Sequence, residues 1–486
     1  MNSTTVDELR LEANKLLDPA RKSELGQFMT PLGIAHFMAG LFGTVSEPVR
    51  LLDAGAGVGS LTSTFLDRQA QIPVEVEAWE VDPTLRQYLE NALADYSARH
   101  SGVRARVHAG DFIEEAVLNL ATHKGKRFTH AILNPPYKKI SSNGKHRLLL
   151  RKVGIETVNL YTAFLALAIL LMERGGEIVA IIPRSFCNGT YYRPFRELLL
   201  HHCAIRHLHV FEARNKAFAD DDVLQENIVI KLEKNGQQGE VMVSDCHDAT
   251  FADCRERAFS FGQIVKPGDA ESFIHIPALD NFDDADSPLF ALCLKETGLE
   301  VCTGPVVDFR LKAHCRAAPE PGAAPLLYAH HFADGRLIFP AAHKKKPNAM
   351  LVNDKTQKWL MPRGFYVLVK RFSAKEERRR IVAFVVNPEE LDAPLYGFEN
   401  HLNVFHVGKH GMDQETAYGL ALFLNSSIVD TCFRVFSGHT QVNATDLRQM
   451  RYPSQDKLKE FGRFAMGGQL SQAEIDDYIR QAEKHG

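Results

Sequence analysis

Several features that mark secreted, metal-binding or membrane proteins are missing from this sequence. The eight cysteines lie scattered between Cys187 and Cys432 without a CxxC pair, so we predict neither a zinc site nor a disulfide framework. The longest apolar run, Tyr161–Met172, is about half as long as a membrane-spanning helix and predicts a buried helix instead. No basic stretch followed by an apolar one opens the chain, as a secretion signal would. We therefore expect a cytoplasmic protein without a membrane partner.

The sequence also lacks the strong positive charge of many nucleic-acid-binding proteins. Its 486 residues carry a formal net charge of −3. This charge is distributed unevenly, because residues 1–300 contain 32 Lys and Arg against 40 Asp and Glu, whereas residues 301–455 contain 20 against 14. The later part of the chain is therefore the better candidate to face phosphate groups.

The pattern of apolar segments predicts two domains and a tail. Up to about residue 275, short apolar strands alternate with helices, which is typical of a mostly parallel α/β sheet covered on both faces. We expect the strand NIVIKLEK to be the last of this set. The acidic, turn-rich stretch DNFDDADSP then marks a boundary. We predict a first domain over residues 1–279, a mixed α/β domain over 280–455 and a helical tail over 456–486.

A glycine-rich turn, DAGAGVG, follows the first predicted strand. Ligands of such sheets bind at the carboxyl ends of the strands, and Gly55 and Gly57 would let a cofactor approach the backbone closely. Asp53 opens this turn, and Glu80 ends the second strand, where a carboxylate can accept hydrogen bonds from a ribose. Dinucleotide-binding enzymes share these features, so the two strand ends alone leave the ligand open.

The third and fourth strands narrow the chemistry. Asp111 follows the third strand, where its carboxylate could accept from an adenine amino group while Phe112 packs on the ring. The fourth strand runs into Asn134-Pro-Pro-Tyr137. The two prolines fix φ and remove two backbone donors, which leaves the Asn134 side-chain oxygen and the Pro135 carbonyl as acceptors beside the flat ring of Tyr137. Two acceptors and a π-surface suit a planar group with an exocyclic amino group, whose lone pair they would localise for attack.

In their order along the chain, GQFMTP, DAGAGVGS, EVDP, GDF and NPPY resemble the motifs of the γ-class N6-adenine DNA methyltransferases of type II restriction–modification systems. The resemblance implies a Rossmann-like methyltransferase domain that uses S-adenosylmethionine, followed by a mixed α/β DNA-recognition domain. It implies that the target adenine is swung out of double-stranded DNA and stacked between Tyr137 and Phe218. The catalytic corner is then formed by Asn134, Pro135, Pro136 and Tyr137. The cofactor-binding residues implied are Gln27, Phe28, Thr30, Asp53, Gly55, Gly57, Glu80, Asp111, Phe112 and Asn134.

The C-terminal half resembles the recognition part of type II adenine methylases in segments such as RVFSGHTQVNATDLR. Amide side chains can pair with adenine edges and arginine with guanine, while lysines suit phosphates. A solvated surface explains the basic runs 344–346 and 378–380 equally well, and a backbone-bonded turn explains Gln441 and Asn443 equally well. The basic segment 138–157 could also close over the site. The residues expected to contact DNA are Lys138, Lys139, Lys344, Lys345, Lys346, Arg378, Arg434, His439, Thr440, Gln441 and Asn443.

The sequence therefore favours a site-specific DNA adenine N6-methyltransferase, either the modification enzyme of a restriction–modification system or a solitary relative. A cognate restriction endonuclease would act separately, because the roughly 25 residues before the first motif are too few for a nuclease domain. The alternatives are a methyltransferase acting on RNA or protein and a non-catalytic DNA-binding subunit of a defence complex. A dehydrogenase would leave the Asn-Pro-Pro-Tyr corner unexplained, and cytosine N4 methylation more often goes with serine at position 134.

Overall fold

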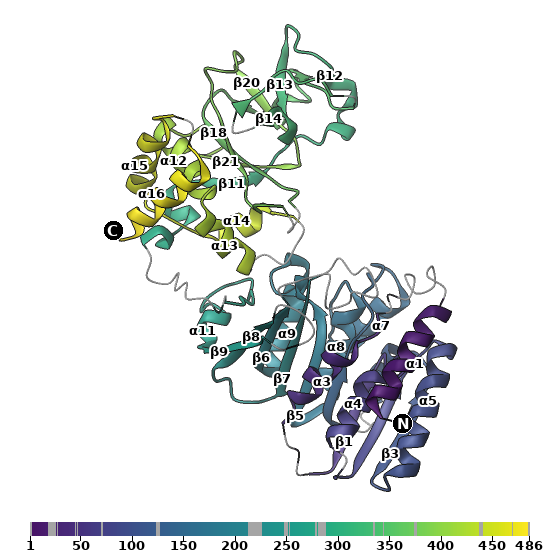
Figure 1. Ribbon diagram of the computed structural model, residues 1–486. Helices are drawn as coiled ribbons and strands as arrows, with labels where there is room; N and C mark the ends of the chain where they lie inside the picture. Colours follow the sequence, from purple (N-terminus) through teal and green to yellow (C-terminus); the bar gives the residue numbers. More distant parts are fainter. Residues whose placement is uncertain are drawn as a thin grey trace. The chain divides into compact units, whose positions relative to one another are not determined.

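The chain forms two compact units, Met1–Asp280 and Asn281–Gly486, in the computed structural model (Figure 1). Among the described helices, none has the length and apolar character needed to span a membrane. The structure describes all residues except 1, 18–25, 27, 44, 46, 70, 123–126, 212–225, 247–250, 252, 278, 280–287, 334–335, 344, 374–376, 437–440, 469 and 485–486.

The first unit is built on a nine-stranded sheet with the order β3-β2-β1-β4-β5-β7-β6-β8-β9. The first five strands of this order run parallel, whereas β7 lies antiparallel to β5 and to β6. This confirms the predicted α/β class. The strands are β1 (Val49–Ala54), β2 (Val74–Trp79), β3 (Val103–His108), β4 (Phe128–Leu133), β5 (Met172–Pro183), β6 (Cys203–Phe211), β7 (Asn227–Lys234), β8 (Val241–Cys246) and β9 (Arg255–Phe259).

Two expectations about the end of this unit are wrong. NIVIKLEK is not the last strand, because β8 and β9 follow it as an antiparallel pair that extends the sheet. Neither is the chain without a disulfide, since Cys246 at the end of β8 is bonded to Cys254 just before β9. The hairpin brings together two cysteines eight residues apart, a spacing that no CxxC search detects.

Helices cover both faces of the sheet (Figure 1). Successive strand residues point to opposite faces, so Leu52 and Leu133 join one apolar cluster while Leu51 and Ile132 join the other. The predicted buried helix over Tyr161–Met172 is confirmed as α8, which packs in the first cluster. The helices are α1 (Ser3–Leu16), α3 (Leu32–Gly40), α4 (Ser60–Arg68), α5 (Pro83–Arg99), α6 (Phe112–Thr122), α7 (Lys145–Lys152), α8 (Leu160–Leu171), α9 (Arg193–His202) and α11 (Phe261–Ile264).

The second unit contains two larger sheets of short strands, with the orders β11-β21-β18-β19 and β12-β16-β13-β20-β17. Two small pairs, β10 with β22 and β14 with β15, complete its strands. The strand bounds are β10 (Leu292–Cys293), β11 (Glu300–Thr303), β12 (Cys315–Arg316), β13 (Ala323–Leu327), β14 (Phe332–Ala333), β15 (Arg336–Leu337), β16 (Ala349–Leu351), β17 (Leu360–Pro362), β18 (Tyr366–Lys370), β19 (Ala383–Val386), β20 (Leu395–Phe398), β21 (Leu402–His406) and β22 (Arg451–Tyr452).

The helices of the second unit come from its C-terminal part, and the last two pack into its core. Phe461 and Ile479 lie in one apolar cluster with Leu420 and Phe423 of α12. Helices α12 and α15 cross closely at glycine, since a Cβ on Gly419 would meet the carbonyl oxygen of Leu458. The helices are α12 (Gln414–Leu424), α13 (Ser427–Phe436), α14 (Ala444–Gln449), α15 (Gln455–Ala465) and α16 (Gln472–Lys484).

Candidate active site

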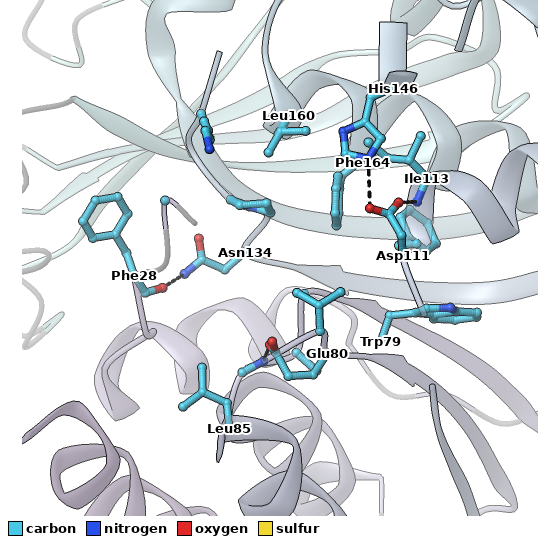
Figure 2. A pocket seen from close by; sticks show the side chains of 18 of the residues that line it. Phe28, Trp79, Glu80, Leu85, Asp111, Ile113, Asn134, His146, Leu160 and Phe164 are labelled. Atoms are coloured by element: carbon cyan, nitrogen blue, oxygen red, sulfur yellow. Dashed lines mark hydrogen bonds and ion pairs between the residues drawn. The ribbon is translucent and has the colours of Figure 1, made fainter. Parts of the chain in front are cut away.

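A cavity of about 440 Å³ opens at the carboxyl ends of β1 to β4, the position at which parallel sheets bind ligands. Its walls come from the glycine loop after β1, from Trp79 at the end of β2, from Glu80 directly after it, from Asp111 after β3 and from Asn134 after β4 (Figure 2). Its volume lies within the range of about 300 to 1,000 Å³ typical of small-molecule pockets. The cavity thus gathers four strand ends that the sequence singled out.

The glycine loop leaves room for a ligand beside its backbone. Gly57 has a φ of +59°, in the left-handed region that favours glycine. A Cβ at this position would have no neighbour closer than Met29 Cγ at 4.0 Å, so the space beside Gly57 is open. Its N–H donates to Glu80 Oε2 at 2.9 Å, which ties the loop to the next strand end.

Glu80 lies at the cavity wall with its carboxylate nearly buried. Its Oε1 accepts from the N–H of Asp82 at 2.7 Å, and burial raises its pKa to about 7. Each carboxylate oxygen has two lone pairs, so Glu80 keeps acceptor capacity for a ligand hydroxyl. A carboxylate poised near neutral pH in a pocket is a candidate binding group on physical grounds.

Asp53 does not line the cavity, in contrast to its predicted role as a ligand contact. Its side chain is fully buried, and Oδ2 accepts from Thr62 Oγ1 of α4 at 2.6 Å. Burial raises its pKa to about 7. Asp53 therefore links β1 to α4, the two elements between which the glycine loop runs, and so stabilises the loop.

Asp111 lines the cavity after β3, and its carboxylate is already hydrogen-bonded within the protein. Its Oδ1 accepts from the N–H groups of Ile113 and Glu114 at 2.9 and 3.2 Å, which caps the start of α6. Its Oδ2 lies 2.9 Å from His146 Nε2. Figure 2 marks this contact between the two labelled side chains. Burial alone would raise the pKa of Asp111, but the hydrogen bond and charge of His146 outweigh it and lower the pKa overall. The same hydrogen bond raises the pKa of His146.

The helix that carries His146 closes this end of the cavity. Lys145, also on α7, forms an ion pair with Glu114 of α6, with 2.5 Å between Nζ and Oε1. Residues 138 to 141 and 144 to 146 line the cavity, so the basic segment after the Asn-Pro-Pro-Tyr corner is folded over it. Lys138 and Lys139 are exposed at its rim.

Three aromatic or basic wall residues were missed by sequence reasoning. Trp79 directly precedes Glu80, and its position at a strand end could have identified it. Phe164 lies on the apolar helix α8 and was indistinguishable from a core residue; its ring centroid lies 5.1 Å from that of Phe112. Phe112, which the sequence did predict, is 2% exposed and contributes to the wall from within the core. His146 belongs to the basic segment 138–157, and nothing in that segment distinguished it as a residue of the cavity wall.

The Asn134 side chain is held in one orientation. Its Nδ2 donates to the Phe28 carbonyl at 2.6 Å, a bond marked in Figure 2, and also to Thr30 Oγ1 at 3.0 Å. Because both amide protons are thus engaged, Oδ1 is the acceptor left for a ligand, and at present it accepts from the Tyr137 hydroxyl at 3.1 Å. The GQFMTP motif therefore orients the Asn134 amide, in addition to bordering the cavity. Gln27 of this motif lies outside the described residues.

The Tyr137 ring lies next to Phe28, with 5.6 Å between ring centroids, and its hydroxyl also lies 3.2 Å from the Ile181 carbonyl. Pro135 is buried and Pro136 lines the cavity, so the corner is packed on both sides. Among the described residues, no group donates to the Pro135 carbonyl. Phe218, the predicted second stacking residue, lies outside the described residues.

Gly26 contacts the backbone of the Asn-Pro-Pro-Tyr corner and helps to position it. Its φ is +67°, its carbonyl accepts from the Tyr137 N–H at 3.1 Å, and a Cβ here would lie 3.1 Å from the Tyr137 backbone nitrogen. We expect Gly26→Ala to displace the corner and reduce turnover by about tenfold or more, because small misplacements of reacting groups are costly. Gly43→Ala is the matched control, since Gly43 has the same φ of +67° but no atom within 4 Å of its Cβ position. Equal rates for the two variants would contradict this role.

In the second unit, several residues predicted to contact DNA are engaged within the protein. Lys346 pairs with Asp308 at 2.8 Å, and Arg434 pairs with Asp430 at 2.6 Å. Arg380, part of the basic run 378–380, is fully buried. Asn443 caps α14, where its N–H donates to Asp446 Oδ2 at 3.0 Å. Structural roles therefore account for these four residues.

The remaining candidates of this unit are placed differently. Lys345 and Arg378 are exposed. Gln441 is half-buried and forms an isolated β-bridge with Phe372. The Phe372 residue is 44% exposed. Lys344, His439 and Thr440 lie outside the described residues.

Comparison with known proteins identifies the family of the chain. The model described as Eco57I restriction-modification methylase matches residues 81–218. The chain is 49% identical over 490 residues to the type II methyltransferase M.BsuBI of Bacillus subtilis, covering 98% of this chain and 97% of that protein. The chain belongs to the type II methyltransferases. It is also 39% identical to the type II methyltransferase M.PstI of Providencia stuartii, over 98% of this chain and 96% of that protein.

The resemblance to this family found in the motifs is thereby confirmed. Among solved structures, a DrdV–DNA complex is similar with a TM-score of 0.56, covering 96% of this chain and 59% of that chain. Its sequence identity is 12%, so this similarity concerns the fold alone. A type II methyltransferase with a Rossmann-like sheet therefore carries the cavity described above.

Proposed function

We propose that this type II methyltransferase transfers the methyl group of S-adenosylmethionine to the N6 amino group of adenine at a specific site in double-stranded DNA. The observation that carries the proposal is the fixed Asn134 amide, whose Nδ2 is held by Phe28 and Thr30. Its Oδ1 accepts from the Tyr137 hydroxyl and has a second lone pair for a ligand amine. An acceptor so oriented suits an amino group better than any group without protons to donate.

The residues of the cavity fit the proposed cofactor. Gly57 leaves open space beside its backbone, Glu80 offers carboxylate acceptors for ribose hydroxyls, and Trp79, Phe112 and Phe164 provide apolar and aromatic wall for an adenine ring. When bound, S-adenosylmethionine supplies an electrophilic methyl group. The Asp111 carboxylate would accept a hydrogen bond from the adenine amino group of the cofactor, at the end of the cavity that α7 covers.

The chain's own contribution to the reaction is orientation and electrostatics. Asn134 Oδ1 and the Pro135 carbonyl would accept the two amino protons, which localises the nitrogen lone pair for attack on the methyl carbon. Acceptors that are already oriented cost no rearrangement when the amine arrives. The Tyr137 ring would stack on the flipped base, since the target atom of a duplex is otherwise out of reach. In this proposal the second unit recognises the DNA sequence, whereas the first unit transfers the methyl group.

Cofactor affinity should depend on the charge of Glu80. Because ribose hydroxyls donate to an ionised carboxylate, affinity should rise as pH increases through about 7, to which burial raises the pKa of Glu80. We expect about tenfold tighter binding at roughly pH 8 than at pH 6, measured by calorimetry. Glu80→Gln should bind more weakly and lose this dependence. A dependence that persists in Glu80→Gln would point instead to Asp53 or His146.

Transfer of a tritiated methyl group from S-adenosylmethionine tests the proposal directly. Label should enter double-stranded DNA, and RNA and protein offered in parallel should remain unlabelled. Preferential labelling of RNA or protein, or no transfer to any of the three by a protein that binds the cofactor, would refute the proposed substrate.

A further inference from the structure

A second cavity, of about 730 Å³, lies wholly within the second unit. It is lined by β11 and β17, each of which is an outer strand of one of the two larger sheets of that unit. Its apolar floor includes Val301 and Leu360, both buried. Arg448 on α14 donates from Nε to the Val301 carbonyl at 3.2 Å, so the free edge of β11 faces a cation. We call this space the edge-strand cavity.

Four cations surround the edge-strand cavity: Lys295, Lys358, Lys409 and Arg448. All four are exposed, and within the described part of the chain none of them forms an ion pair. Glu300 is the one acidic side chain among the described residues of the lining. Burial lowers the pKa of His406, so this lining residue adds no positive charge near neutral pH. The cavity therefore has an excess of positive charge that the described residues do not neutralise.

The cations converge on a common space. Arg448 and Lys409 line the cavity together with Cys302. Burial raises the pKa of Cys302, and the positive charges of Arg448 and Lys409 both oppose this rise. Lys358 Nζ lies 5.0 Å from the ring centroid of Trp359, which is 37% exposed at the rim. An open space with converging cations and an indole donor suits oxygen-rich anions such as phosphates.

We propose that the edge-strand cavity binds the phosphate backbone of the DNA substrate and holds the duplex in register on the second unit. The inference rests on the proposed function, because it takes DNA as the ligand. Charge complementarity selects this occupant, since the basic residues first expected to meet phosphates, such as Lys346 and Arg434, are paired with carboxylates within the protein. Backbone contacts of this kind orient a protein on DNA without reading its sequence.

The test is the salt dependence of DNA binding by the triple variant Lys295→Gln, Lys358→Gln, Lys409→Gln. These side chains are exposed and removing their charge leaves the Arg448 hydrogen bond in place. The slope of log affinity against log salt should become shallower by about 0.9 for each phosphate that the variant no longer neutralises, hence by about 2.7 if all three lysines bind phosphate. Affinity for any duplex should fall by the same factor, so that preference for the methylated sequence is unchanged.

The matched control is Lys312→Gln with Lys355→Gln, two exposed lysines of the same unit that do not line the cavity. The control should keep the wild-type slope. Binding is measured by fluorescence anisotropy without methyl donor, on the wild type as well. A wild type that binds no DNA would refute the proposed function. A triple variant with the wild-type slope, or a control whose slope changes equally, would refute this inference alone. Loss of AMP or inorganic phosphate binding in a triple variant that binds DNA normally would also overturn it, in favour of a small-anion site.

Discussion

Asn134→Ala should reduce methyl transfer by a factor on the order of a hundred or more, while leaving DNA affinity nearly intact. The variant removes Oδ1, the oriented acceptor of the proposed target amine, and with it the hydrogen bond from the Tyr137 hydroxyl. DNA affinity should persist because the groups that would bind phosphates are unchanged. Single-turnover rates at saturating cofactor and DNA give the effect on the chemical step, and fluorescence anisotropy gives the affinity.

Thr30→Val is the graded control for this prediction. It removes one of the two acceptors of Asn134 Nδ2 and leaves the Phe28 carbonyl at 2.6 Å in place. A neutral hydrogen bond contributes about 0.5 to 1.5 kcal/mol, so transfer should fall only several-fold. An Asn134→Ala variant that methylates at near wild-type rate would show that the amide does not act on the reacting group.

Tyr137→Ala should weaken the flipped state by about 1 to 3 kcal/mol, the usual scale of stacking between a base and an aromatic side chain. Tyr137→Phe keeps the ring and removes only a hydroxyl that lies 3.1 Å from Asn134 Oδ1 and 3.2 Å from the Ile181 carbonyl. Because this hydroxyl occupies the same oxygen that the target amine needs, its removal should be partly offset, and Tyr137→Phe should remain close to the wild type.

The fluorescence of 2-aminopurine at the target position reports base flipping in both Tyr137 variants. It should rise on binding of wild type and Tyr137→Phe, and much less on binding of Tyr137→Ala. If Tyr137→Phe proves as damaging as Tyr137→Ala, the hydroxyl rather than the ring is the functional group.

The sequence predicted best those features that local pattern controls. The four strands that come shortly before Gly55, Glu80, Asp111 and Asn134 follow from short apolar runs closed by turns, and a parallel sheet must bring the ends of such strands to one edge. What local pattern does not reveal is the direction of a side chain at a strand end. Asp53 therefore looked like a ligand contact, although it points beneath the loop to Thr62.

Long-range pairing explains the other differences. Lys346 looked like a free cation because its partner Asp308 lies 38 residues away in the sequence. His146 belonged to a basic run and gave no sign that α7 would fold back onto Asp111, 35 residues before it. The hydrogen bonds from Asn134 to Phe28 and Thr30 span more than 100 residues. Contacts of this kind arise only when the sheet has assembled, so neither spacing nor composition predicts them.

The identity of the methylated base tests the central claim most directly. The protein is incubated with double-stranded DNA and S-adenosylmethionine that carries a deuterated methyl group, the DNA is digested to nucleosides, and the products are separated by mass. If Asn134 Oδ1 and the Pro135 carbonyl receive the protons of an adenine amino group, the label will appear in N6-methyladenine. Label in N4-methylcytosine or 5-methylcytosine, or unlabelled DNA from a protein that binds both substrates, would contradict the account.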